Sequence, residues 1–511
     1  MNLRIREMVA GDVPGAAMIE SVTFDAPWSE RLFAEDLVAS GRHWFVAERD
    51  GELVGYAGGW LLQDDAHLMN IAVRADARGH GTGRALLSTL IVRLKESGAR
   101  RMTLEVRPAN TAAIALYESV GMRPAGLRPG YYAETGEDAL IMWGELEDTY
   151  PEDRPPLILA IESSCDETAA AVIMGERTLL ANIVASQIDF HARFGGVVPE
   201  IASRKHTEAI VDVIAEAMQE AGGALREAGD TRAPTAGEPL DFSALDAIAV
   251  TYGPGLVGAL VVGLAYAKGL AFATGLPLVG VNHLEGHIFA NVLADPAVQP
   301  PLVALLVSGG HTSLVHMPRW GEYRTMGETL DDATGEAFDK VAKVLGLGYP
   351  GGPVLSRLAA DGDPTALDFP RAMMRSGDYQ FSLSGLKTAV INHIRHEQAA
   401  GREIDVPDLA ASFQAAVIDV QVSKAVRAVT ETGATTFCLG GGVAANPALR
   451  EALRSAIEPL GVHVSVPPLH LCTDNAAMIA AAGYHRYLNG DRLGLEADAM
   501  PGLRLDVVDP A

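Results

Sequence analysis

The chain has 511 residues, of which 48% are hydrophobic and 21% are charged, and its formal net charge is −25. This length is too great for one hydrophobic core and predicts roughly three or four domain-sized units, while the composition excludes a disordered chain. The acidic balance in both halves of the chain argues against a protein that binds nucleic acid through its overall charge.

Three further features of the sequence concern its location. Cys165, Cys438 and Cys472 are far apart and form no C-x-x-C pair, which argues against a disulfide framework and a thiolate zinc site. Charged residues interrupt the first few positions, so the start does not have the apolar core of a secretory signal. The most membrane-like stretch, 256–267, is twelve residues long and too short to span a bilayer. We therefore expect a cytoplasmic protein without a membrane partner.

The first part of the chain has the alternating pattern of a small α/β domain. The pattern predicts a helix at 29–40, strands at 44–48, 53–61 and 68–73, a helix from Gly83, and a strand at 102–106. From residue 142 to 156 the sequence becomes acidic and rich in proline, which indicates an interdomain linker. We place the first domain at 1–148 and the linker at 149–156.

A glycine-rich segment, RGHGTGR at 78–84, lies between the strand that ends at Val73 and the following helix. Backbone N–H groups at the start of that helix could bind a phosphate. Such a loop is also often only a tight turn. It is not a Walker loop, because no Gly-Lys-Ser/Thr follows.

Two later segments, LEVRPAN at 104–110 and AIALYESVGM at 113–122, complete this pattern. Together with the glycine-rich loop they resemble the GNAT N-acetyltransferases, in particular the RimI branch that acetylates protein N-termini, over about the whole first domain. The resemblance implies that acetyl-CoA is the co-substrate and that the N-terminal alanine of a ribosomal protein is the acceptor. The residues that it assigns to acetyl-CoA are Ile71, Ala72, Val73, Gly79, His80, Gly81, Thr82, Gly83, Arg84 and Asn110.

The resemblance also implies two catalytic residues. Glu105 would remove a proton from the amine, through a water molecule, and Tyr117 would protonate the departing thiolate. Outside this context, Glu105 would form a salt bridge at the end of a strand and Tyr117 would belong to the core face of a helix.

The second part of the chain repeats one layout. Residues 157–174 have the pattern of strand, polar turn and strand, and residues 302–317 repeat it around SGGHT at 308–312. Two such hairpins predict two related lobes that face a cleft. Residues 221–240, rich in alanine, glycine and proline, predict a mobile insertion. We place the second domain at 157–500 and a C-terminal tail at 501–511.

Two histidines stand four residues apart in the segment HLEGH at 283–287. On a helix, His283 and His287 would share one face, and the carboxylate of Asp474 would complete a set typical of non-haem iron. On spacing alone, histidines that cap a helix or bond within a core are the commoner explanation. The spacing argues against a metalloprotease, because Leu284 stands where a zincin needs glutamate.

Blocks of sequence from 161 to 475 are similar, in the same order, to those of the TsaD/Gcp family. They are IESSCDET at 161–168, GGVVPE at 195–200, GPGLVG at 253–258, HLEGH at 283–287, SGGHT at 308–312, DDATGEAFDK at 331–340, YPGGP at 349–353, FSLSGLK at 381–387, GGGVAAN at 440–446 and CTDN at 472–475. The resemblance implies an α/β chain in which the GNAT domain is followed by a two-lobed actin/Hsp70-like ATPase fold. It implies transfer of a threonylcarbamoyl group from its adenylate to the exocyclic N6 amine of the adenosine beside the anticodon, in tRNAs that read codons starting with A.

The same resemblance assigns ligands and partners. His283, His287 and Asp474 would bind one divalent metal ion, with Fe²⁺ expected and Zn²⁺ as the alternative. The residues assigned to the adenylate are Leu306, Val307, Ser308, Gly309, Gly310, Asp339, Gly352 and Asn446. The expected partners are tRNA, a smaller actin-like relative of the TsaB type and a P-loop ATPase of the TsaE type, the last two on separate chains.

Two questions stay open from the sequence. Asp166 and Glu167, on the first hairpin turn, either act near the reacting centre or stabilise the turn. A scaffold that binds nucleotide only to recruit partners is the alternative to a transferase, and the intact His-His-Asp set favours catalysis.

Because the chain is acidic, a tRNA would need a local basic patch. The candidates are Arg193, Arg204, Lys205, Arg371, Arg375 and Lys387.

Overall fold

The computed structural model describes residues 3–24, 26–49, 51–63, 65–78, 81–118, 120–132, 135–145 and 154–506. The chain divides into two compact units, of which the first contains Met1–Pro155 and the second contains Pro156–Tyr487 and Asp491–Val508. Gly79 and His80 of the glycine-rich loop, and residues 149–153 of the predicted linker, lie outside the described residues.

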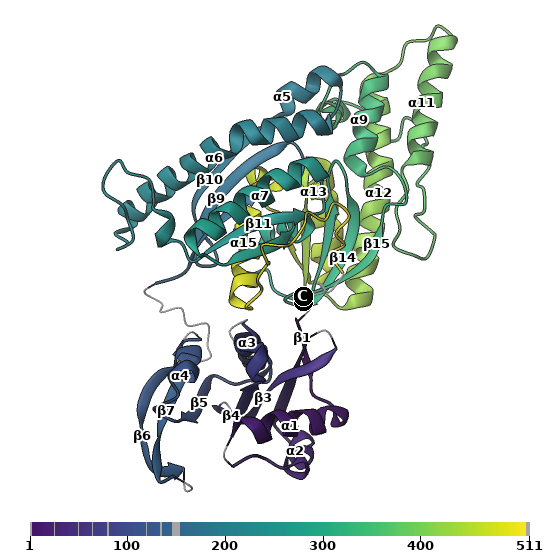
Figure 1. Cartoon of the computed structure of the whole chain (residues 1–511). Helices are drawn as coiled ribbons and strands as arrows, with labels where there is room; N and C mark the ends of the chain where they lie inside the picture. Colours follow the sequence, from purple (N-terminus) through teal and green to yellow (C-terminus); the bar gives the residue numbers. More distant parts are fainter. Residues whose placement is uncertain are drawn as a thin grey trace. The chain divides into compact units, whose positions relative to one another are not determined.

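The first unit is built on one seven-stranded sheet with the strand order β1-β2-β3-β4-β5-β7-β6 (Figure 1). Its strands are β1 (Leu3–Glu7), β2 (Arg42–Arg49), β3 (Glu52–Leu62), β4 (Asp65–Val73), β5 (Arg101–Val106), β6 (Arg123–Tyr132) and β7 (Glu137–Glu145). Only the β4–β5 pair is parallel among the described strands of this sheet, and the other neighbours are antiparallel.

Helices cover both faces of this sheet because the central strands are apolar on both sides. Alternate residues of β2 point in opposite directions, so Trp44 packs with α1 (Val13–Thr23) and α2 (Glu30–Leu37), and Phe45 packs with α3 (Thr82–Glu96). A fourth helix, α4 (Thr111–Glu118), follows β5. The sequence predicted α2, β2 to β5 and α3, but not α1, whose apolar positions do not follow a clear helical period.

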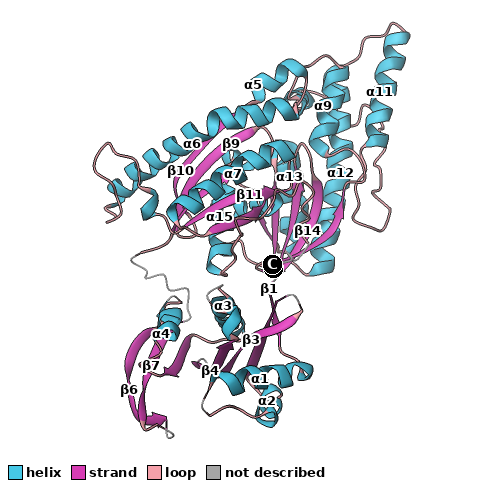
Figure 2. Cartoon of the chain, viewed as in Figure 1, coloured by secondary structure: helices cyan, strands magenta, loops and turns pink. Residues whose placement is uncertain are grey.

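The second unit contains two five-stranded sheets of the same design (Figure 2). The first has the order β10-β9-β8-β11-β12 and the second β15-β14-β13-β16-β17. In each sheet the first three strands are antiparallel and the last two join in parallel. The predicted pair of related lobes, each begun by a hairpin, is therefore confirmed.

The strands of these two sheets follow the chain closely. The first sheet contains β8 (Leu157–Glu162), β9 (Glu167–Met174), β10 (Thr178–Ser186), β11 (Ala247–Gly253) and β12 (Leu278–Asn282). The second contains β13 (Leu302–Val307), β14 (Thr312–Arg319), β15 (Glu322–Glu328), β16 (Thr436–Gly440) and β17 (His463–Ser465).

Helices form three layers around the two sheets. α8 (His283–Ala294) and α15 (Ala476–Leu488) pack between the sheets in a common core. α6 (Pro199–Ala228) and α7 (Val257–Thr274) cover the outer face of the first sheet, and α12 (Val406–Thr432) and α13 (Pro447–Ile457) cover that of the second. The remaining α-helices are α5 (Ile188–His191), α9 (Thr334–Val344), α10 (Gly351–Ala359), α11 (Ser384–Ala399) and α14 (Leu469–Cys472).

The structure corrects the predicted insertion at 221–240. α6 continues to Ala228, so the first eight of these residues are helical, and Gly222 and Leu225 are buried. A Cβ atom on Gly222 would lie 2.9 Å from Cγ of Pro234, so this glycine allows the following loop to pack against the helix. Gly222 therefore marks a close approach of backbone, not the end of the helix.

The predicted C-terminal tail also carries core residues. Leu503 packs into the core beneath α6 and α7, and Leu505 packs into the core between the sheets. Residues 501–506 are therefore part of the second unit, and residues 507–511 lie outside the described residues.

The apolar stretch expected at 256–267 belongs to a longer helix than its sequence indicated. α7 continues past Lys268, whose ammonium group donates a hydrogen bond to the carbonyl of Ala497. With 18 residues and a mean hydropathy of 1.6, α7 could cross a membrane by length and composition alone. One of its faces is buried against β11 and α6.

Candidate functional site

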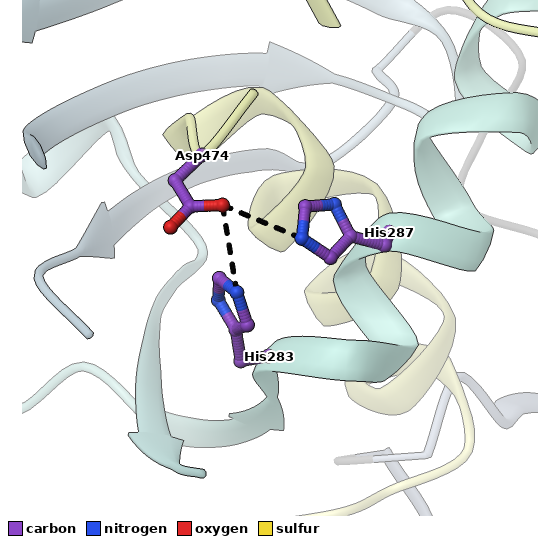
Figure 3. A group of neighbouring side chains, drawn as sticks. All are labelled: His283, His287 and Asp474. Carbon is purple, nitrogen blue, oxygen red and sulfur yellow. Dashed lines mark ion pairs between the residues drawn. The ribbon is translucent and has the colours of Figure 1, made fainter. Parts of the chain in front are cut away.

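The two histidines of HLEGH lie on the first turns of α8. Asn282 caps this helix, because its side-chain oxygen accepts a hydrogen bond of 2.8 Å from the N–H of Leu284. The helix therefore begins at His283, and His287 follows one turn later on the same face. Asp474 lies between α14 and α15 and points at both imidazoles (Figure 3).

The structure brings these three predicted ligands together. Oδ1 of Asp474 lies 3.5 Å from Nε2 of His283 and 3.4 Å from Nε2 of His287. One ligand atom from each of the three residues lies within 4.8 Å of the others. The exposed fractions of the side chains are 6% for His283, 1% for His287 and 19% for Asp474, so the site opens on the carboxylate side.

The unsatisfied polar atoms of His287 support a cation at this point. Both of its ring nitrogens are buried, and within the part of the chain that the structure describes Nδ1 has no hydrogen-bond partner and Nε2 has only the long contact of 3.4 Å with Oδ1 of Asp474. Buried polar atoms without a partner are costly, and their persistence requires an explanation. A divalent ion that accepts the lone pair of Nε2 would supply one, and two imidazoles with one carboxylate suit iron or zinc.

Glu162 is a functional residue of this site to which the sequence assigned no role. It ends β8 and is fully buried, and its Oε2 lies 3.1 Å from Nδ1 of His283. Thr251 donates a hydrogen bond of 2.6 Å to the same oxygen. A carboxylate on Nδ1 holds the Nδ1–H tautomer and directs the lone pair of Nε2 toward Asp474. A glutamate at the end of the otherwise apolar run LILAIE was the available signal.

Opposite charges set the proton equilibria of this cluster. Burial alone would raise the pKa of Asp474, but the imidazoles of His283 and His287 hold it well below its usual range. Burial opposes a charged His283, yet Asp474 and Glu162 raise its pKa to about 9. Burial and the two neighbouring histidines lower the pKa of His311 to about 4. His311, in SGGHT, is thus a second neighbour of this site, and no role was predicted for it.

The glutamate of HLEGH does not belong to the cation site. Oε1 of Glu285 accepts a hydrogen bond of 2.6 Å from the hydroxyl of Tyr323, and Oε2 accepts one of 2.7 Å from Nε of Arg486. Its side chain is only 3% exposed. Both carboxylate oxygens are therefore engaged in a buried ion pair, and a protease mechanism would have no general base at this position.

The loop predicted to hold the adenylate follows β13. Leu306 and Val307 are buried in the two cores on either side of that strand, so only their backbone could contact a ligand. Ser308 closes a tight turn, because its N–H donates a hydrogen bond of 2.8 Å to the carbonyl of His311. A Cβ atom at Gly309 or Gly310 would meet nothing within 4 Å, so the backbone of both glycines faces open space.

The other residues predicted for the adenylate have local partners. Oδ1 of Asp339 accepts a hydrogen bond of 2.7 Å from the N–H of Gly351 at the start of α10, next to Gly352. Asn446 caps α13 and donates a hydrogen bond of 2.7 Å to Oε1 of Gln414. The structure thus brings Asp339 and Gly352 together, while Asn446 contacts α12. Their role in adenylate binding stays a prediction.

The acetyl-CoA residues of β4 lie where two strands separate. β4 pairs with β5 only over Asp65–His67 and Arg101–Thr103, among the described residues. Beyond this point Ile71, Ala72 and Val73 pair with β3 on the other side. Their backbone edge toward β5 is therefore open to an extended ligand.

The end of this open edge leads to the glycine-rich loop. Gly81 has a φ of 80° and immediately precedes α3, so Thr82, Gly83 and Arg84 form the first turn of that helix. Nη2 of Arg49 donates a hydrogen bond of 3.0 Å to the hydroxyl of Thr82. Unpaired N–H groups at a helix start attract phosphate, which agrees with the predicted role of the loop.

The two predicted catalytic residues of the first unit, Glu105 and Tyr117, lie in surroundings that differ from each other. Glu105, on β5, has an exposed fraction of 12%, and its Oε1 pairs with Nη1 of Arg128 at 3.0 Å. Tyr117 is buried in α4, and this burial, with the nearby Tyr132, raises its pKa above the usual range. Asn110 caps α4 by accepting a hydrogen bond of 3.2 Å from Ala113. No role was predicted for Arg128.

The basic residues proposed for tRNA have different local neighbours. Arg371 and Arg375 line a cavity of about 570 Å³ together with Asp419, which accepts a hydrogen bond of 2.9 Å from Nε of Arg371. Arg193 and Lys205 both lie over the ring of Phe190. Lys387 pairs with Asp332. Two of the candidates therefore share a cavity, and two others share an aromatic ring.

The fold and the sites define an enzyme with two domains. The second unit has a two-lobed actin-like fold with a candidate cation site near the glycine turn of SGGHT. The first unit has a sheet in which the parallel strands β4 and β5 separate after a short pairing. Residues 178–481 match the family model "tRNA N6-adenosine threonylcarbamoyltransferase" (TsaD), and residues 15–122 match the Acetyltransferase (GNAT) family. The chain belongs to the TsaD family and carries a GNAT domain at its N-terminal end. The predicted family fusion and fold class are thus confirmed.

Two curated relatives agree with the assignment to the TsaD family. The tRNA N6-adenosine threonylcarbamoyltransferase of Moorella thermoacetica is 55% identical over 349 residues, which are 68% of this chain and 97% of the relative. That of Symbiobacterium thermophilum is 54% identical over 351 residues, 69% of this chain and 97% of the relative. The solved ribosomal-protein-S18-alanine N-acetyltransferase of Escherichia coli is 37% identical, with a TM-score of 0.27, over 29% of this chain and 97% of its own.

Proposed function

We propose that the second unit transfers a threonylcarbamoyl group from its adenylate to the N6 amine of the adenosine beside the anticodon, in tRNAs that read codons starting with A. The observation that carries this proposal is the convergence of His283, His287 and Asp474 in a chain of the TsaD family. The amine nitrogen forms a bond to the carbamoyl carbon, the bond from that carbon to the phosphate oxygen breaks, and the amine loses one proton. A nucleotide-binding scaffold would have no evident need of this set.

Different residues of the second unit would have different roles in this reaction. A divalent ion held by His283, His287 and Asp474, with Fe²⁺ expected and Zn²⁺ as the alternative, would supply a Lewis acid for the carbamoyl oxygen. Glu162 keeps the imidazole of His283 in the required orientation through its contact of 3.1 Å. The open backbone at Gly309 and Gly310 allows close approach of the phosphate and ribose of the adenylate.

Partners and location are part of the same proposal. The acidic chain would hold tRNA on local basic residues, of which Arg371 and Arg375 share a cavity. We expect help from a TsaB-type relative and a TsaE-type P-loop ATPase on separate chains. Because tRNA and ribosomal proteins are the substrates, we place the protein in the cytoplasm.

The test of the transferase uses the full-length chain loaded with Fe²⁺, synthetic threonylcarbamoyl adenylate, an unmodified tRNA transcript and the two partner proteins. We expect mass spectrometry of the digested tRNA to show threonylcarbamoyladenosine at the position beside the anticodon. The matched reaction contains a tRNA in which guanosine replaces that adenosine. Equal modification of both tRNAs, or of neither, would contradict the proposal.

We also propose that the first unit acetylates the N-terminal amine of a ribosomal protein that begins with alanine, with acetyl-CoA as donor. The support is the GNAT family match together with the open edge of β4 next to Glu105. A carboxylate there can take a proton from the amine. Tyr117 keeps its own proton at neutral pH, since the ordinary pKa of tyrosine lies near 10 and burial raises it further. Tyr117 can therefore protonate the thiolate of coenzyme A as the acetyl group leaves.

The substrate class can be tested with two peptides of the same sequence. One begins with a free alanine and carries an internal lysine, and the other has a blocked α-amine. We expect acetyl transfer only to the α-amine of the first peptide, as measured by mass spectrometry. Acetylation of the lysine in both peptides would replace this proposal with a different amine specificity.

A further inference from the structure

One histidine lies beside the predicted base of the first unit, at the point where β4 and β5 separate. His67 is the last residue of β4 that pairs with β5, opposite Thr103. Its Nε2 lies 3.2 Å from Oε2 of Glu105. The imidazole and the carboxylate are thus direct neighbours, at the start of the open edge that carries Ile71, Ala72 and Val73.

Both ring nitrogens of His67 have oxygen neighbours. Nδ1 lies 3.2 Å from the hydroxyl oxygen of Thr103, and Nε2 faces the carboxylate oxygen of Glu105. A threonine hydroxyl can rotate to donate or to accept, and a carboxylate accepts. In the neutral ring, Nδ1–H can donate to the threonine hydroxyl, which leaves the lone pair of Nε2 facing Oε2 of Glu105 and able to accept a proton. In the imidazolium both nitrogens donate to these oxygens.

The second oxygen of Glu105 is already engaged. Oε1 pairs with Nη1 of Arg128 at 3.0 Å, which holds the carboxylate in place from β6. Oε2 is therefore the oxygen that remains for a proton, and it is the one that faces His67. A proton that arrives at Oε2 has the ring nitrogen as its neighbour.

Burial favours the neutral ring of His67 before the reaction. Burial lowers the pKa of His67, Glu105 on β5 raises it, and Arg128 on β6 and Arg42 on β2 lower it. The side chain of Glu105 is 12% exposed, whereas that of His67 is 35% exposed. The imidazole is thus the member of the pair with better access to water.

We propose that His67 is the proton-relay partner of Glu105 in acetyl transfer, an inference that rests on the proposed acetyltransferase function. One N–H bond of the substrate ammonium breaks, and its electron pair stays on nitrogen for attack on the acetyl carbon. The proton goes to Oε2 of Glu105 and is shared with Nε2 of His67, while Nδ1–H donates to Thr103. The charge of the pair changes from −1 to zero, and His67 returns the proton to water.

The first experiment compares His67→Gln with the full-length wild type, using acetyl-CoA and a peptide that begins with alanine. Glutamine can still bond to Glu105 but cannot accept a proton. We expect kcat to fall roughly 10-fold or more, with an unchanged Kd for acetyl-CoA and a shifted ascending limb in the pH profile of kcat/KM. The matched control is His43→Gln, a half-buried histidine on β2 whose neighbouring charges are Arg93 and Glu7; its profile should superimpose on the wild type.

Two results would overturn the relay. The first is a His67→Gln profile equal to that of the wild type, and the second is a loss of rate that follows entirely from weaker acetyl-CoA binding. Glu105→Gln separates this inference from the proposed function. If Glu105→Gln is inactive while His67→Gln is fully active, only the relay fails. If Glu105→Gln retains the wild-type rate, the proposed role of Glu105 fails with it.

Discussion

The two sites of this chain differ in how much of their geometry the protein supplies before any ligand binds. In the second unit, His283 and His287 are almost fully buried and both face one oxygen of Asp474. In the first unit, Glu105 is flanked by Arg128, whose side chain is 57% exposed, and the cofactor edge consists of backbone. A site made of three converging side chains depends on each of them, whereas a backbone edge tolerates the loss of single side chains. The two sites should therefore respond differently to mutation.

The largest expected effect separates the two activities. His283→Ala removes one of three ligands of the cation site, so we expect loss of bound metal and of tRNA modification, while peptide acetylation stays at the wild-type rate. Metal analysis and the two activity assays on one preparation measure all three quantities. Loss of both activities in a folded variant would show that the two units are not chemically independent.

A smaller effect on metal binding is expected for Glu162, which contacts the predicted ligand His283. Glu162→Gln keeps the shape of the side chain but removes the charge that faces Nδ1 of His283 at 3.1 Å. Removing such a partner of a metal-bound histidine typically lowers metal affinity by about 10- to 100-fold. We expect a loss in this range in competition titrations with a chelator of known affinity.

A matched glutamate–histidine pair provides the control. Glu176 lies 3.0 Å from Nε2 of His485, and neither residue belongs to the cation site. Glu176→Gln should therefore leave metal affinity unchanged. Equal losses in the two variants would mean that Glu162 contributes to folding in general and has no specific role in orienting His283.

In the first unit, Tyr117→Phe should slow acetyl transfer without weakening acetyl-CoA binding. The hydroxyl group is removed, while the ring that packs in the core is retained. Loss of a general acid costs roughly 100-fold or more in many enzymes, but a thiolate leaves more easily than an alkoxide, so we expect about tenfold. Steady-state kinetics measure the rate of acetyl transfer, and a binding titration measures the affinity for acetyl-CoA. Unchanged turnover would remove Tyr117 as the acid.

The sequence predicted the parts of each site that depend on spacing. His283 and His287 lie on one face because an α-helix repeats every 3.6 residues, and the glycines of SGGHT mark a turn after an apolar strand. The two hairpins predicted two lobes, because the pattern of apolar strands is local. Asp474 was a candidate by the chemistry of its carboxylate, and the family resemblance then assigned it, since no local rule joins it to residues almost two hundred positions earlier.

Contacts between distant segments could not be predicted in the same way. Glu162 meets His283 only because β8 and β12 lie on either side of β11 in one sheet. His67 meets Glu105 because β4 and β5 pair for three residues and then separate. The helical end of α6 was missed because Gly222 usually weakens a helix, and here the packing of Pro234 against it outweighs that preference. In each case tertiary packing decided what local sequence could not.

The smallest expected effect concerns the stability contributed by the control pair. His485 and Arg177 hydrogen-bond to Glu176 and lower the pKa of its carboxyl group from 4.5 to about 2. Because the folded pKa is lowered, the stabilisation is present above about pH 4.5 and disappears as the pH falls through about 2. Glu176 has an exposed fraction of 37%, so solvent screening keeps this contribution below about 1 kcal/mol. We expect Glu176→Gln to unfold at a slightly lower temperature than the wild type near pH 7, in calorimetric scans, and the difference to shrink below pH 4.5. If the difference in unfolding temperature grew on acidification, the ion pair of Glu176 would be contradicted. Of the two glutamate–histidine pairs, carboxylate charge would then matter only in the buried pair of Glu162 and His283.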